Sequence, residues 1–191
     1  MALAHLLQEN KGEILEKWIS RVLASYPDDA AMIFQREKDR FANPIGYNTR
    51  HALTALYDLL FSGDQPDPAK VAAVVEDFVK IRAVQTFTPA AAVAFVRDLK
   101  VVVREYCRKQ KDAAPALADW HRFEDTLDAV SDQVFDLYMA CRERLYKARL
   151  HEISHMNHML TQHGCPSSLL DADQSAKTAV NPIHIHSNEA R

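Results

Sequence analysis

The chain is poor in glycine, with only 4 among its 191 residues. So few glycines leave little material for the tight turns of an all-β fold or for a phosphate-binding loop. A basic surplus is also missing, because the formal net charge is -3, and this argues against a nucleic-acid-binding surface. No apolar run reaches the roughly 18 residues that a membrane span needs, and the amino terminus lacks the apolar region of a signal peptide.

Cysteine is scarce as well. The three cysteines, Cys107, Cys141 and Cys165, lie far apart and without CxxC spacing. An odd, scattered set is typical of free thiols in a reducing compartment, so we expect a cytoplasmic protein. No partner that would mark a cysteine nucleophile can be identified, and the carboxylates are spread over predicted helix faces rather than paired. We therefore expect no enzyme.

Apolar residues recur at helical spacing through most of the chain, and prolines separate the segments. Asp67–Pro68 and Thr88–Pro89 each have the form of an N-cap followed by a first-turn proline. Gly12 is expected to weaken the first helix. The pattern predicts an all-α bundle of five to six helices with a long C-terminal helix. The expected helices run over about 3–23, 27–41, 47–61, 67–81, 88–106 and 120–161.

The last helix carries an apolar seam with alternating steps of three and four residues. Its members are Trp120, Phe123, Leu127, Val130, Val134, Leu137 and Cys141. Such a heptad-like seam can face a bundle partner or another subunit. We predict that it serves as an interface, in a homodimer or toward a protein partner, through Trp120, Leu127, Val134, Leu137 and Cys141.

The sequence predicts two regions. Residues 1–160 have the periodicity of a helical domain. Residues 161–191 are rich in Ser, Asp and Ala and have no periodicity, so we expect a disordered, histidine-containing tail.

Histidine is the abundant residue type, with 9 in the chain. Six of them lie in the last 41 residues, namely His151, His155, His158, His163, His184 and His186. The first two form an HExxH pattern with Glu152, which on a helix can hold zinc and supply a general base. The metzincin extension would need glycine and histidine where His158 and Thr161 stand. We interpret the match as fortuitous, in a segment where histidine is common.

A simpler metal site is an alternative. His151, His155 and His158 share one helix face, and imidazoles at this spacing suit zinc or another transition metal. The other interpretations are a solvated polar helix end and a pH-sensitive patch. Haem is not expected, because the mid-chain candidates, His51 and His121, have no distinctive context.

A second group of polar residues flanks the predicted helix ends. A small pocket between helices with a few convergent polar groups is one interpretation. The other is structural, in which an Asn–Pro turn and helix caps tie these residues together. The residues of this group are Arg40, Asn43, Tyr47, His51, Arg82 and Gln85.

Four stretches, in this order and spacing, resemble the RsbRD N-terminal domain family, named for an RsbT co-antagonist of the bacterial stressosome. They are Ile14–Trp18 (ILEKW), Arg36–Tyr47 (REKDRFANPIGY), Arg82–Pro89 (RAVQTFTP) and Phe135–Glu143 (FDLYMACRE). The resemblance covers roughly residues 10–150.

The resemblance implies a sensory or regulatory input module rather than a catalyst. In the family such domains precede a STAS domain or a histidine kinase and pass a signal down a C-terminal helix. The sequence contains neither segment, so we expect it to act in trans on a protein partner of the STAS or kinase-regulator type, with no nucleic acid involved. The alternative is a metal- or haem-binding sensor that uses the histidine-rich helix or an internal pocket.

Overall fold

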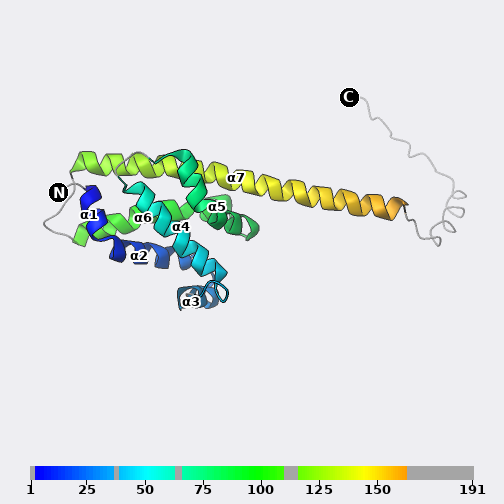
Figure 1. Ribbon diagram of the computed structural model, residues 1–191, viewed down its shortest axis with the longest axis horizontal. Helices are drawn as coiled ribbons and strands as arrows, with labels where there is room; N and C mark the ends of the chain where they lie inside the picture. Colours follow the sequence, from blue (N-terminus) through cyan, green and yellow to red (C-terminus); the bar gives the residue numbers. More distant parts are fainter. Residues whose placement is uncertain (1–2, 37–38, 63–65, 110–115, 163–191) are drawn as a thin grey trace, which may run out of the picture. The chain divides into compact units, whose positions relative to one another are not determined.

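The computed structural model describes residues 3–36, 39–62, 66–109 and 116–162 (Figure 1). Over these residues it contains seven helices and no strand, which confirms the predicted all-α bundle with a long last helix. The helices are α1 (Leu3–Glu9), α2 (Lys11–Leu23), α3 (Asp28–Arg36), α4 (Pro44–Leu60), α5 (Pro68–Val84), α6 (Pro89–Lys109) and α7 (Leu117–Gln162).

The chain divides into two compact units, Met1–Tyr146 and Lys147–Arg191, and the boundary falls inside α7. The first unit holds α1 to α6 and the first part of α7. The tail expected over 161–191 lies outside the described residues from position 163 onward. Within the described ranges, no helix is long and apolar enough to cross a membrane.

Three helices begin at a side-chain cap followed by proline. Ahead of Pro89, the Thr88 hydroxyl accepts from the Ala91 N–H at 3.3 Å, as predicted for α6. The carboxylate of Asp67 accepts from the Ala69 N–H at 2.9 Å, ahead of Pro68, as predicted for α5. The side chain of Asn43 accepts from the Gly46 N–H at 2.8 Å in the same way. The Asn43 cap starts α4 at Pro44, three residues before the predicted position.

The first predicted helix is in fact two helices, and the break lies at Asn10 rather than at Gly12. The Asn10 side chain donates to the Leu6 carbonyl at 2.8 Å, which is the local bonding by which asparagine competes with a helix. Gly12 lies inside α2, and a Cβ added there would meet no other part of the fold within 4 Å. The count of seven helices therefore exceeds the predicted five to six.

The second predicted helix ends earlier than expected, at Arg36 instead of Phe41. The carboxylate of Asp39 accepts from the Phe41 N–H at 2.7 Å and from the Ala42 N–H at 2.9 Å. Such a turn occupies the backbone donors that a continuing helix would use.

The core of the first unit draws on all its helices except α3, whose Phe34 packs against it. Helix α2 packs on α4 and α6, and α4 packs on α5. Trp18 is fully buried and donates its indole N–H to the Phe95 carbonyl at 2.7 Å, which joins α2 to α6. The Tyr57 hydroxyl donates to the Leu7 carbonyl at 2.8 Å and joins α4 to α1.

Candidate functional site

A buried arginine occupies the end of α5. Arg82 is only 1% exposed, and its guanidinium lies over three aromatic rings, with centroid distances of 5.4 Å to Tyr26, 4.9 Å to Phe78 and 4.7 Å to Phe87. A guanidinium over ring faces at these distances is a cation–π arrangement. Burial lowers the pKa of Arg82, because water no longer solvates the charge.

The Arg82 guanidinium bonds mainly to backbone. It donates to the Ala91 carbonyl at 3.2 Å, to the Ser25 hydroxyl at 3.0 Å and to the Val22 carbonyl at 3.4 Å. These contacts join the end of α2, the end of α5 and the start of α6. The Nε atom of Arg82 is buried without a hydrogen-bond partner in the described structure.

Gln85 belongs to the same junction. Its side-chain carbonyl accepts from the Tyr26 hydroxyl at 3.0 Å, and it is the C-cap residue of α5. Burial raises the pKa of Tyr26, while the positive charge of Arg82 and the bond to Gln85 partly offset this increase. Arg82 and Gln85 therefore meet around Tyr26, in the structural arrangement that the sequence left open as one of two alternatives.

The other four residues of the predicted pocket make their own set of contacts along the start of α4. The Arg40 guanidinium lies 5.6 Å from the Tyr47 ring centroid, and the Tyr47 and His51 rings stack at 6.2 Å. Asn43 caps α4 and also donates to the Phe34 carbonyl at 3.0 Å. A ligand pocket that combines both sets stays a prediction.

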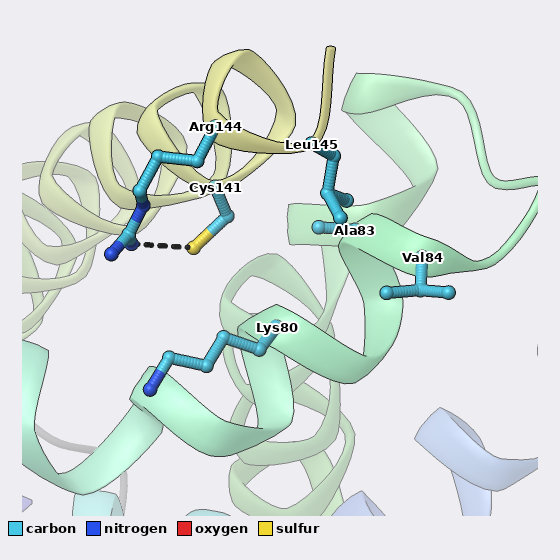
Figure 2. A pocket seen from close by; sticks show the side chains of 6 residues that line it. All are labelled: Lys80, Ala83, Val84, Cys141, Arg144 and Leu145. Carbon is cyan, nitrogen blue, oxygen red and sulfur yellow. Dashed lines mark hydrogen bonds between the residues drawn. The ribbon is translucent and has the colours of Figure 1, made fainter. Parts of the chain in front are cut away.

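A pocket does exist in the first unit, at a place that sequence reasoning missed. It lies between the end of α5 and α7 and has a volume of about 340 Å³ (Figure 2). Its lining residues are Lys80, Ala83, Val84, Cys141, Arg144 and Leu145. No sequence signal marks it, because its members are ordinary surface or core residues on helices 60 positions apart.

The pocket is next to a direct link between the two helices. Arg142 of α7 donates from Nη1 to the Ala83 carbonyl of α5 at 2.9 Å. Within α7, Arg144 donates from Nη2 to Cys141 Sγ at 3.3 Å. Ala83 directly follows the buried Arg82. The pocket, the α5–α7 link and the aromatic junction are thus consecutive along one end of α5.

The family profile of the RsbT co-antagonist protein rsbRD N-terminal domain matches residues 12–153. The chain belongs to this family. It is therefore a stress-signalling regulatory domain, and the resemblance seen in the sequence is confirmed. No curated protein and no solved structure matches the chain at a comparable level.

In this RsbRD domain, the predicted interface seam lies in the core of the first unit. Leu127, Val134 and Cys141 are buried, and Trp120 and Leu137 are partly buried and packed against the core. The sequence allowed either a bundle partner or another subunit, and the described structure provides a bundle partner. A docking role for these five residues stays a prediction, and it would require them to leave the core.

The C-terminal histidines of the RsbRD chain lie in the second unit. His151, His155 and His158 are exposed, and the rings of the first two are 4.4 Å apart. Among the described residues, no group of three or more possible ligands is arranged to hold a metal ion. Glu152 of the HExxH pattern is exposed too, and the histidines beyond 162 lie outside the described residues.

The haem candidates are both on the surface. His51 lies in α4 and His121 in α7, and each is exposed.

Proposed function

We propose that the chain is a non-enzymatic, cytoplasmic bacterial regulatory module that acts in trans, through contacts with a signalling partner, after sensing a small ligand. The observation that carries this proposal is the family match over residues 12–153. The name of the family refers to an RsbT co-antagonist, which favours a partner of the STAS or kinase-regulator type.

A candidate docking surface supports the proposal. Phe135, Met139 and Tyr146 on α7 are exposed to 42%, 44% and 54%. Spacings of four and seven residues place them on one helix face, away from the face that packs into the core. Clustered exposed aromatic and methionine side chains are typical of protein contact surfaces.

The test measures binding of purified STAS-domain and RsbT-type regulators from the same bacterium by fluorescence anisotropy. The double variant Phe135→Ser, Met139→Ser is expected to lose at least tenfold in affinity, since it removes two contact side chains. The matched control is Met32→Ser, Ile33→Ser, which removes two apolar side chains of α3 that are exposed to 53% and 58%. The absence of binding to any such regulator would overturn the proposal, and an equal loss in both double variants would show that the docking surface is wrong.

A metal-binding sensor is the second candidate. The close pair of His151 and His155 favours it, because two imidazoles one helical turn apart can chelate zinc, nickel or copper. Elemental analysis and an ultraviolet–visible spectrum of the untagged protein test it. We expect bound metal to disappear in His151→Ala, His155→Ala and to persist in His5→Ala, His121→Ala. If the wild-type protein is colourless and metal-free, even after incubation with zinc, the candidate is wrong.

A further inference from the structure

We propose that the pocket between α5 and α7 binds a small amphiphilic monoanion, an apolar chain that ends in a carboxylate. This inference rests on the proposed function and names the class of ligand that the module would sense. Three features of the pocket carry it: an apolar lining, two cationic side chains at its edge, and contact with both helices of the α5–α7 link.

The floor and one wall are apolar. Ala83 and Cys141 are buried at the base, and Leu145 is half-buried beside them. Val84 is 62% exposed at the rim, although it is an apolar residue at the end of a helix. The volume of about 340 Å³ is at the small end of the range for ligand pockets. The walls therefore suit a short hydrocarbon chain, which would cover Val84 and the floor.

The exposed lining is almost wholly apolar, so the charged ends of Lys80 and Arg144 lie at the edge of the pocket rather than in it. In Figure 2 the Arg144 guanidinium and the Lys80 ammonium group lie on the same side of the pocket, opposite Val84. Lys80 already forms ion pairs with Glu76 at 3.0 Å and with Asp77 at 3.4 Å. No acidic side chain of the described residues forms an ion pair with Arg144, whose one hydrogen bond goes to Cys141 Sγ.

Arg144 is consequently the cation that can accept an anionic head group. A guanidinium presents a planar pair of donors that matches a carboxylate. The acidic neighbours of Lys80 limit the positive potential, which favours one negative charge over several. An apolar chain against the lining and Val84, with its carboxylate at the edge beside Arg144, would match both features.

A ligand there would touch both helices of the α5–α7 link. It would contact Ala83, whose carbonyl accepts the Arg142 bond, and Leu145, one turn further along α7. Occupancy can therefore bias the packing between α5 and α7, as a sensor requires, provided that the ligand prefers one arrangement.

The test uses octanoate as the probe, with octanamide as an uncharged chain of equal length and acetate as the charge without the chain. Titration of the full chain is followed by amide NMR shifts. We expect octanoate to shift Ala83, Val84, Cys141 and Leu145, octanamide to bind at least threefold more weakly, and acetate to cause no shifts at the same concentrations. Equal binding of octanoate and octanamide, or shifts centred elsewhere, would overturn the inference.

Three exposed-site variants refine the test. Arg144→Gln is expected to weaken octanoate binding about three- to fivefold, as for one exposed ion pair, and to leave octanamide binding unchanged. Val84→Glu should weaken octanoate binding more than tenfold, since it places a negative charge at the apolar rim. Arg97→Gln removes an exposed arginine of α6 and should bind octanoate like the wild type. Equal affinities in Arg144→Gln and Arg97→Gln would contradict the assignment of Arg144.

The two proposals can fail separately. If octanoate does not bind while a purified regulator does, the ligand assignment is wrong and the proposed function stands. If octanoate binds at the pocket and no regulator binds, the ligand assignment stands and the proposed partner function is wrong.

Discussion

At the scale of single residues, Gly46 shows how a turn can depend on one missing side chain. A Cβ atom at this position would lie 2.1 Å from Asn43 Nδ2 and 2.6 Å from the Phe34 carbonyl oxygen. The first neighbour is the cap of α4, and the second is backbone that cannot move aside cheaply. The close approach of α3 to the start of α4 therefore requires glycine here.

We predict that Gly46→Ala lowers the free energy of unfolding by about 1–3 kcal/mol, because it overpacks the turn and displaces the Asn43 cap. Urea unfolding followed by circular dichroism measures this change. Gly12→Ala is the matched control, since a Cβ at Gly12 meets nothing within 4 Å. It should raise the stability by up to about 1 kcal/mol through helix propensity. Equal effects of the two substitutions would contradict the role of Gly46.

Arg82 is the other residue on which the first unit depends. A lysine would keep the charge but lose the planar group that lies over three rings and the fork that reaches Ala91 and Ser25. We predict that Arg82→Lys costs about 2 kcal/mol or more in urea unfolding, because it leaves buried acceptors without a donor. Arg97→Lys, at an exposed position, should stay within about 0.5 kcal/mol of the wild type. If Arg82→Lys lowers the free energy of unfolding as little as Arg97→Lys does, the aromatic junction contributes little to stability.

At the scale of elements, buried hydroxyl groups hold neighbouring helices together. The seven-residue helix α1 is too short to be stable alone, so it depends on packing and on the bond from Tyr57 to the Leu7 carbonyl. Burial raises the pKa of Tyr57 well above its ordinary value, and the nearby Asp58 adds to the increase. The folded chain therefore holds this proton more tightly than the unfolded chain does.

The pH dependence follows from this difference in pKa. The stabilisation from the protonated Tyr57 hydroxyl is complete below the tyrosine pKa of the unfolded chain, about 10. It is lost as the pH rises through the Tyr57 pKa of the folded chain. We predict that the free energy of unfolding begins to fall near about pH 10 and keeps falling as the pH rises further, and that Tyr57→Phe makes this decline shallower. The variant should also lose about 1 kcal/mol at neutral pH, for the missing hydrogen bond. An unchanged alkaline slope in urea unfolding would rule out Tyr57 as its source.

At the scale of the whole molecule, the apolar seam of α7 can serve either as part of the core or as an interface with another subunit. Val134 is fully buried among the helices of the first unit. We predict that Val134→Asp lowers the free energy of unfolding by more than about 3 kcal/mol, since it buries an unpaired carboxylate. Thermal unfolding and light scattering measure this together. Val84→Asp, at an exposed position, should leave the fold intact. A Val134→Asp protein that stays folded but halves its mass would indicate an interface instead.

The sequence by itself determined the family, the helical class and most helix starts. Asp67–Pro68 begins α5 because its cap needs only local backbone geometry, and the seam of α7 follows from helical periodicity alone. The helix boundaries that the sequence did not predict also have local causes. Asn10 broke the first helix through a bond to the preceding turn, and the Asp39 turn ended α3 early, two effects that apolar spacing does not reveal.

Only the tertiary structure decided what the functional residues meet. It buried Arg82 among rings from three segments, and it placed Lys80 and Val84 beside Arg144 and Leu145, which are distant in the sequence. It also turned the seam into core and left Phe135 and Met139 on the surface. The physical reason is that periodicity shows which residues share a helix face, whereas packing between helices determines which face is covered and which cations find a carboxylate.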